Sequence, residues 1–188
     1  MKQPFIVLEG LSASGKSTIC RLLAEKIGAV LYTSPSVLYD PIRKSIDQKA
    51  DVNARFFFYL SSNIQSSIEI EQICETKPVV CDRYFISTVC THKVMDVDTD
   101  NFIMIENLPI IAPDFYFLIT CNEEIRIRRM NERGLDHNDK REIILNSDER
   151  TLKEYKKYGQ LIEIDNSSDD PMDAVNKIVS LINAKNLN

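Results

Sequence analysis

The sequence of 188 residues has no excess of positive charge, no CxxC pair and no apolar run long enough to cross a bilayer. Its net charge is -5, which argues against a general nucleic-acid-binding surface, so we expect no nucleic-acid partner. The lack of a long apolar run likewise predicts no membrane partner. The five cysteines are odd in number and lie mostly among apolar neighbours. We therefore expect buried free thiols in a cytoplasmic protein rather than a metal or redox site.

The sequence also lacks internal repeats, low-complexity tracts and Pro/Gly-rich linkers, which predicts one domain over residues 1–188. Short, nearly continuous apolar runs alternate with helical patterns, as in a parallel sheet covered on both faces. The expected strands are 5–10, 78–83, 114–121 and 160–165, with a weaker candidate at 29–34. The expected helices are 16–27, 54–75, 123–133, 139–157 and 171–185. This alternation indicates an α/β doubly wound fold, in which ligands bind beyond the carboxyl ends of the strands.

The stretch GLSASGKST matches the phosphate-loop pattern G-x-x-x-x-G-K-[ST] directly behind the first apolar run. The glycines allow successive N–H groups to turn onto phosphate oxygens, and the following helix adds its positive N-terminal end. Lys16 is expected to reach the β- and γ-phosphates of ATP, and the Ser17 hydroxyl to bind Mg²⁺. The expected triphosphate-binding residues are Gly10, Ser12, Ala13, Ser14, Gly15, Lys16, Ser17 and Thr18.

Asp82 ends the apolar run PVVCD and is the expected second magnesium ligand opposite the phosphate loop. The alternative is an aspartate that merely caps a turn. A switch GTPase would carry a glycine soon after this aspartate and an Asn-Lys-x-Asp sequence, and neither is present. Arg83 follows instead, and a guanidinium beside the metal-binding carboxylate suits a second anionic or hydroxylated substrate.

An arginine-rich helix is predicted to end in a lid. Arg126, Arg129 and Arg133 share one helical face, and Gly134 is followed by a polar stretch that places the lid at about 134–141. Closure would bring an arginine to the transferring group, with Arg129 and Arg133 as the catalytic candidates. The alternative is a salt-bridged surface helix, since two glutamates precede the arginines. The two histidines are expected at the surface as ordinary residues: His92 and His137.

The helix at 54–75 carries four consecutive aromatic residues, more than one core face requires. Core packing is one interpretation. The other is that Phe58 stacks on a flat heterocyclic substrate while Asn63 and Gln65 hydrogen-bond to its edge. A stripe of apolar residues four positions apart is expected to be buried: Leu60, Ile64 and Ile68.

The order of these motifs resembles the thymidylate kinase branch of the P-loop nucleoside and nucleotide kinases. The resemblance rests on FIVLEGLSASGKST, the aromatic helix, DRYFIS, the arginine lid and IEIDNSS, and covers nearly the whole chain. It implies a three-layer αβα fold with a five-stranded parallel sheet, Mg²⁺-ATP as donor and phosphoryl transfer to a nucleoside monophosphate. By position it implies that Arg83, Tyr84 and Ser87 face the acceptor, and that Asn166 and Ser167 border the adenine.

Three departures from the family pattern leave the acceptor open. Ser12 replaces an acidic residue of the phosphate loop, Thr33-Ser34-Pro35 replaces Arg-Glu-Pro, and an arginine expected near Ser62 or Asn63 is missing. The leading hypothesis is a small-molecule phosphotransferase acting on a nucleotide. The alternatives are a nucleoside kinase, with Asp82 as the base for a hydroxyl acceptor, and an ATP-driven switch whose acceptor is water. The sequence also allows a homodimer.

Overall fold

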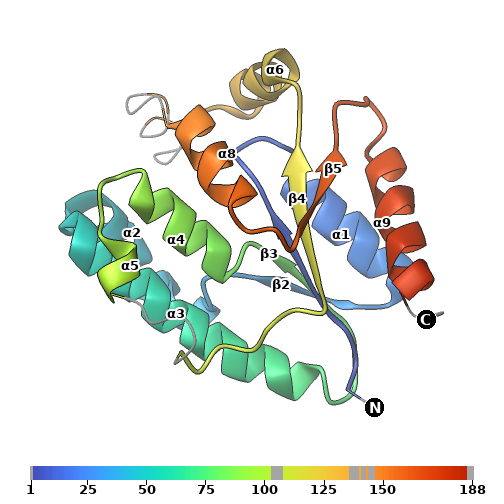
Figure 1. Ribbon diagram of the computed structural model, residues 1–188, viewed down its shortest axis with the longest axis horizontal. Coiled ribbons are helices and arrows are strands. Elements are labelled where there is room, and N and C mark those ends of the chain that lie inside the picture. The colour runs from blue at the N-terminus through green and yellow to red at the C-terminus, as the bar shows by residue number, and fades with distance from the viewer. Residues whose placement is uncertain (1, 103–107, 136–139, 141–142, 144–146, 186–188) are drawn as a thin grey trace.

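The computed structural model describes residues 2–102, 108–135, 140, 143 and 147–185. Its centre is a five-stranded parallel sheet in the order β2-β3-β1-β4-β5, which confirms the predicted fold class (Figure 1). The strands are β1 (Phe5–Glu9), β2 (Val30–Thr33), β3 (Val79–Asp82), β4 (Phe115–Thr120) and β5 (Leu161–Asp165).

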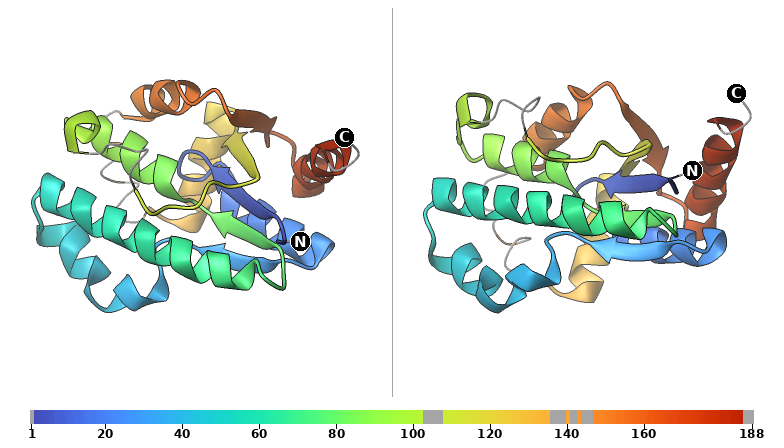
Figure 2. Two further views of the ribbon diagram at one scale, coloured as in Figure 1. Left: turned by 60° about the horizontal axis from the view of Figure 1, so that its bottom comes forward. Right: turned by 90° about the horizontal axis from the view of Figure 1, so that it is seen from below.

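Helices cover both faces of the sheet, giving the three layers that Figures 1 and 2 show. One apolar cluster joins the sheet to α1 and α9, and the other joins it to α3, α4 and α8. The helices of the described residues are α1 (Lys16–Ile27), η1 (Val37–Tyr39), α2 (Asp40–Lys49), α3 (Val52–Ile73), α4 (Phe85–Lys93), α5 (Thr99–Phe102), α6 (Glu123–Arg133), α8 (Asp148–Lys156) and α9 (Pro171–Lys185).

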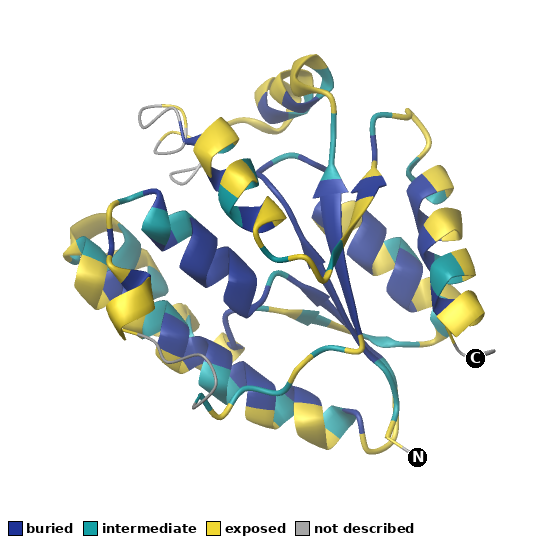
Figure 3. Ribbon diagram, in the orientation of Figure 1, coloured by how far each residue is buried: buried dark blue, intermediate teal, exposed yellow. Residues whose placement is uncertain are grey.

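The central strand β1 shows why apolar runs were the right signal for this sheet. Phe5 and Val7 point into the cluster under α3, α4 and α8, whereas Ile6 and Leu8 point into the cluster under α1 and α9. Every residue of β1 and β3 is buried, as the dark strands in Figure 3 show. Each buried Phe, Ile, Val or Leu side chain among them contributes about 1.5–3 kcal/mol of burial free energy. The edge strand β2 alternates between half-buried and exposed residues, which explains its weaker signal.

The buried face of α3 differs from the predicted apolar stripe. Leu60 is buried, but Ile68 is 49% exposed, so this prediction was wrong at its C-terminal end. The face instead includes small polar residues whose hydroxyl and amide groups bond to neighbouring segments: Asn63 donates to the Thr88 hydroxyl at 2.8 Å, and Ser67 accepts the Ile111 N–H at 2.7 Å. Polar groups satisfied in this way can be buried without apolar periodicity.

Three further features bear on the predictions. His92 is buried, 3% exposed, and its Nδ1 lies 2.7 Å from the Thr88 carbonyl oxygen, so its expected surface position was wrong. His137 lies outside the described residues. All five cysteines are free thiols and four are buried. Within the described ranges, no helix has the length and apolar character needed to cross a membrane.

Candidate functional site

The phosphate loop connects the end of β1 to the start of α1 with a backbone that needs its glycines. Gly10 has φ 143° and Gly15 has φ 94°, and Ala13 adds a third positive angle, φ 57°. A Cβ atom on Gly15 would lie 2.1 Å from Asn166 Nδ2, and one on Gly10 would lie 2.4 Å from the Ile119 carbonyl oxygen. Both glycines are therefore fixed by sterics as well as by backbone angles.

Lys16 and Ser17 begin α1 inside this loop. The Lys16 ammonium is buried and donates to the Leu11 carbonyl at 2.6 Å, which holds it over the loop. The Ser17 hydroxyl donates to Asp82 Oδ2 at 2.5 Å, so a hydroxyl and a carboxylate converge from α1 and the end of β3. Hard oxygen ligands of this kind are those that Mg²⁺ prefers, and the pair fits the predicted metal site.

A cleft of about 880 Å³ opens beyond the carboxyl ends of β1, β2 and β3. Its wall includes most of the predicted site residues, which the fold thus brings together. Those that line it are Ser12, Ala13, Gly15, Lys16, Ser17, Thr18, Asp82, Arg83, Tyr84, Ser87, Arg129, Arg133 and Asn166. Those that do not line it are Gly10, Ser14, Ser167, Phe58, Asn63 and Gln65.

Arg83 leaves the end of β3 in an unusual conformation. Its φ is 66°, while its N–H donates to the Leu8 carbonyl at 3.0 Å and extends the strand pairing by one residue. The guanidinium Nη1 donates to the Ser87 hydroxyl at 3.2 Å on the first turn of α4. This turn of chain directs Arg83 into the cleft beside Asp82.

Behind Arg83 lies Glu9, whose side chain is fully buried. Burial raises the pKa of the Glu9 carboxyl to about 7, although hydrogen bonds from Ser87 and Tyr84 and the charge of Arg83 oppose the shift. Sequence reasoning assigned no role to Glu9. Its position, as a charged residue at the end of an otherwise apolar strand, was the sequence feature that could have indicated a role.

The three arginines predicted on one face of α6 have different surroundings. Arg126 is buried and donates to the Ser12 carbonyl at 3.2 Å while it pairs with Asp148. Arg129 donates to the carbonyl oxygens of Asn166 at 3.1 Å and Ser168 at 3.2 Å, against the phosphate loop. Arg126 therefore ties elements together rather than facing a ligand.

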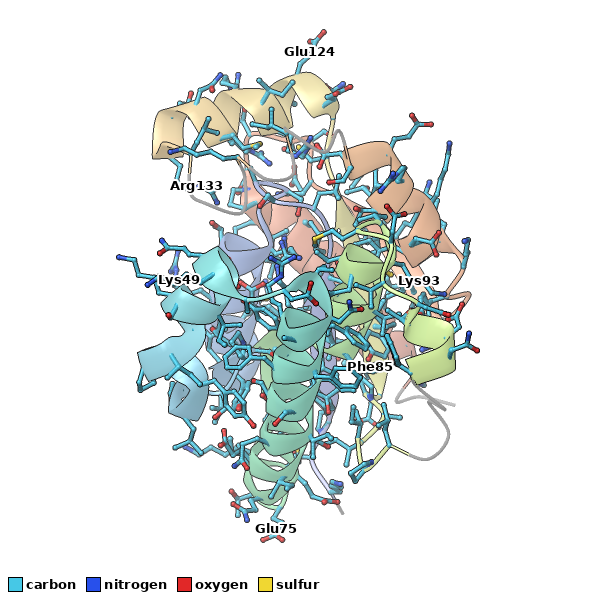
Figure 4. The ribbon with its side chains drawn as sticks, turned by 90° about the vertical axis from the view of Figure 1, so that its left-hand side faces the viewer. Lys49, Glu75, Phe85, Lys93, Glu124 and Arg133 are labelled. Atoms are coloured by element: carbon cyan, nitrogen blue, oxygen red, sulfur yellow. The ribbon has the colours of Figure 1, made fainter. Side chains whose placement is uncertain are left out.

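Arg133 lies at the opposite end of α6 from Glu124, as Figure 4 shows, on the side of the molecule where α2 ends at Lys49. It lines the cleft, as do Arg43 and Asp47 of α2, so the cleft passes between the two helices. Of the predicted lid at 134–141, residues 136–139 and 141 lie outside the described residues.

The far end of the cleft uses residues that sequence reasoning missed. Tyr59 donates to Asp47 Oδ1 at 2.8 Å and accepts from Arg43 Nε at 3.3 Å. Arg55, one turn before Tyr59 on α3, is buried and donates to the Met95 sulfur at 2.9 Å. Arg55 and Tyr59 are four residues apart on α3, a spacing that could have indicated that both face the cleft. The helix α2 could not be predicted, because it has too few apolar residues to form a helical pattern.

The predicted aromatic-helix contacts lie elsewhere. The Phe58 ring packs against Tyr39 with centroids 5.3 Å apart, outside the cleft wall. Asn63 accepts from the Ser34 hydroxyl at 3.2 Å, and Gln65 donates to Glu69 at 2.8 Å. Their predicted contact with a substrate would need the ligand to reach past the residues that line the cleft.

The predicted adenine-side residues follow β5. The Asn166 amide donates to the Ser14 carbonyl of the phosphate loop at 2.8 Å, and its Oδ1 is buried with no hydrogen-bond partner among the described residues. Ser167 accepts the Asn122 N–H at 2.8 Å and donates to Asp165 at 2.6 Å, which ties the start of α6 to the end of β5.

Comparison with known proteins adds an independent line of evidence. A sequence model of the family described as thymidylate kinase matches residues 8–178. The chain is 28% identical over 182 residues to the probable thymidylate kinase of Methanocaldococcus jannaschii, covering 95% of each. It is 30% identical over 151 residues to the thymidylate kinase of Leptospira borgpetersenii serovar Hardjo-bovis, covering 70% of each.

Solved structures are similar in fold. The thymidylate kinase of Ehrlichia chaffeensis superimposes with a TM-score of 0.73 at 21% identity, covering 97% of this chain and 100% of that one. The deoxyadenosine kinase of M. mycoides gives a TM-score of 0.70 at 16% identity, covering 96% and 99%. At these identities the likeness supports the shared fold alone.

Proposed function

The chain belongs to the thymidylate kinase family, and on that premise we propose that this kinase transfers the γ-phosphate of Mg²⁺-ATP to a nucleoside monophosphate. One observation carries the proposal: Lys16, the Ser17–Asp82 pair and Arg83 face one cleft. Its volume of about 880 Å³ is near the upper end of ordinary ligand pockets, consistent with a donor and an acceptor meeting inside it.

The donor end would be the phosphate loop. Its N–H groups and the Lys16 ammonium supply positive potential for the triphosphate, and Ser17 and Asp82 would hold Mg²⁺. When bound, the ion neutralises charge that develops on the β- and γ-phosphate oxygens. Asn166 contacts the loop from the β5 side, and its Oδ1, which has no partner within the part of the chain that the structure describes, is a hydrogen-bond acceptor at this end.

The acceptor end would be the wall formed by α2, α3 and the start of α4. Three arginines, Arg43, Arg55 and Arg83, line this wall, and guanidinium groups bind phosphate bidentately. Their charge favours a monophosphate over an uncharged nucleoside. A phosphate oxygen of the acceptor is already ionised, so it can attack the γ-phosphorus without a base while the bond to the β-phosphate oxygen breaks.

The acceptor base is left to experiment, because Ser12, Ser34 and the polar face near Ser62 replace groups that the family pattern would supply. The direct test is ADP release with Mg²⁺-ATP and a panel of the common nucleosides and nucleoside monophosphates, thymidylate included. We expect slow ADP release alone and much faster release with one or a few monophosphates. Brisk hydrolysis that no acceptor accelerates would contradict the proposal, and a response to nucleosides only would reassign the acceptor.

Lys16→Ala provides the site control in the same assay. It should abolish transfer because it removes the ammonium over the loop. Lys26→Ala is the matched variant: Lys26 lies in the last turn of the same helix, where its ammonium donates to Asn176 on α9. Lys26→Ala should retain the wild-type rate. Loss of activity in both variants would indicate a general defect of α1 rather than a role for Lys16.

A further inference from the structure

The buried carboxylate of Glu9 contacts the residues that follow β3. Its Oε1 accepts the backbone N–H groups of Tyr84 at 3.1 Å and Ser87 at 3.2 Å, and its Oε2 accepts the Ser87 hydroxyl. Glu9 is 0% exposed and does not line the cleft, whereas Arg83, Tyr84 and Ser87 do. Burial raises the pKa of the Glu9 carboxyl to about 7, and the charge of Arg83 acts against that shift. Glu9 therefore lies one layer behind the acceptor wall.

The hydroxyl of Ser87 makes contacts that account for its full hydrogen-bonding capacity. A serine hydroxyl has one proton and two acceptor lone pairs. Its proton is directed at Glu9, Arg83 Nη1 donates to it at 3.2 Å, and the Tyr155 hydroxyl lies 2.8 Å away. When Glu9 is ionised, it accepts the Ser87 proton, and both lone pairs of the hydroxyl are then available, one to Arg83 and one to Tyr155.

From this arrangement we infer that Glu9 is a positioning residue of the transfer site: it fixes the Ser87 hydroxyl, which in turn holds the Arg83 guanidinium where the acceptor phosphate binds. The inference rests on the proposed function, which assigns Arg83 to the acceptor. It adds a role for a residue that touches neither substrate. It also explains why a carboxylate is retained at the end of a strand that is otherwise apolar.

The competing explanation is that Glu9 only caps α4. Its Oε1 does accept N–H groups of the first turn, where negative charge is favourable. The substitution Glu9→Gln separates the two roles. The amide oxygen can still accept the backbone N–H groups, but the amide nitrogen is a donor and cannot accept the Ser87 proton. That proton must then turn toward Tyr155 or Arg83, which weakens the hold on the guanidinium.

The first readout needs no acceptor. In ¹⁵N-labelled protein, the side-chain Nε–H signal of Arg83, assigned with Arg83→Lys, reports how firmly the guanidinium is held. We expect Glu9→Gln to shift this signal and to speed its exchange with solvent. The matched control is Glu69→Gln, which alters a carboxylate that also has three hydrogen bonds, from Tyr32, Ser36 and Gln65, outside the cleft wall. Glu69→Gln should leave the Arg83 signal unchanged.

The second readout is steady-state kinetics with thymidylate, or with the monophosphate of highest turnover if thymidylate is not phosphorylated. Glu9→Gln should lower kcat/KM for the acceptor about 10- to 100-fold, the range expected for a small misplacement of a group that orients the substrate. KM for ATP should change less than about twofold, since the phosphate loop is not disturbed. Glu69→Gln should keep both constants.

The outcomes are distinct. If Glu9→Gln leaves the Arg83 signal as in Glu69→Gln, the inference is wrong and Glu9 is only a helix cap. Equal losses for ATP and acceptor would also overturn it. If Glu9→Gln does not fold, Ser87→Ala tests the same connection, since it removes the bridging hydroxyl and keeps the backbone cap. Should wild-type protein phosphorylate no monophosphate, the proposed function fails, while the Arg83 signal still decides the role of Glu9.

Discussion

Arg126 on α6 and Asp148 at the start of α8 form a largely buried ion pair that joins the two helices on either side of the predicted lid. The same guanidinium donates to the Ser12 carbonyl of the phosphate loop. One side chain thus connects the phosphate loop to the two helices that flank the predicted lid in the sequence. Arg126, which was predicted on the same helical face as the catalytic candidates Arg129 and Arg133, therefore has a structural role.

Arg126→Ala should therefore destabilise the protein. Removing one partner of a buried pair leaves the other charge poorly compensated, which costs about 3–5 kcal/mol. Because the Asp148 side chain is 28% exposed, we expect a loss at or below the low end, about 2–3 kcal/mol. Arg128→Ala is the control, since Arg128 pairs with Asp169 at the surface and should cost less than about 1 kcal/mol. Urea denaturation measures both, and equal losses would contradict the role of Arg126.

Gly15→Ala should weaken ATP binding strongly. The φ of 94° is costly for alanine, and the new Cβ would lie 2.1 Å from Asn166 Nδ2, so the loop and Asn166 must separate. We expect at least about a tenfold rise in the ATP dissociation constant, measured by calorimetry, since one lost hydrogen bond of about 1.4 kcal/mol suffices.

Gly28→Ala is the matched control for that substitution. Gly28 also has a positive φ, 67°, but a Cβ atom added there, at the end of α1, would meet nothing within 4 Å. Its cost should be about 1–2 kcal/mol of folding free energy with unchanged ATP affinity. If Gly28→Ala weakened ATP binding as much as Gly15→Ala, the contact with Asn166 would not be the cause.

The stability of the fold should depend on pH through Glu9. Burial raises the pKa of its carboxyl to about 7 from 4.5, so the folded state keeps a proton that the unfolded chain has lost. The contribution of Glu9 to the free energy of unfolding is thus fully present below about pH 4.5 and is lost as the pH rises to about 7. Over this pH window the free energy of unfolding of the wild type should fall by about 3 kcal/mol relative to that of Glu9→Gln, as measured by chemical denaturation at each pH.

Glu69 should show the opposite sign. Burial raises the pKa of its carboxyl, but hydrogen bonds from Tyr32, Gln65 and Ser36 outweigh burial and hold the pKa below its ordinary value. The contribution of Glu69 is therefore present above the unfolded pKa and lost as pH falls. Wild type should gain stability relative to Glu69→Gln as pH rises. The same slope for both comparisons would mean that a different group titrates.

How far the sequence predicts this protein depends on how local the signal is. The phosphate loop was predictable because its residues are contiguous and its glycines are fixed by backbone angles, as Gly15 illustrates. The three inner strands, β1, β3 and β4, were predictable because apolar runs are the direct consequence of a sheet covered on both faces. The contact between Asp82 and Ser17 follows from the topology: Asp82 ends β3, Ser17 follows the loop after β1, and the carboxyl ends of these neighbouring strands meet at one edge of the sheet.

The far end of the cleft could not be predicted in the same way. α2 folds back against α3, and this brings Arg43 and Asp47 to Tyr59. No residue of α2 is buried, so its sequence has no apolar pattern that would predict this packing. The sequence instead pointed to Phe58, the neighbouring ring, since adjacent aromatic residues on a helix cannot be told apart without knowing the helix rotation. The buried face of α3 was also mispredicted from the spacing of its apolar residues. Small polar residues pack there through tertiary hydrogen bonds, which apolar spacing does not reveal.

Arg133 and Arg129 should separate rate from binding. Arg133, at the end of α6, lines the cleft next to the start of the predicted lid, so Arg133→Ala should lower kcat by about 10³-fold or more if it stabilises the transferring group, with a smaller change in ATP affinity. Arg129 holds the Asn166 and Ser168 carbonyls against the phosphate loop, so Arg129→Ala should chiefly raise KM for ATP. Arg128→Ala, on the exposed side of the same helix, should leave both constants unchanged. Single-turnover kinetics with saturating ATP measure the transfer step directly. Equal losses of binding and rate at Arg133 would rule out a lid arginine that acts only during transfer.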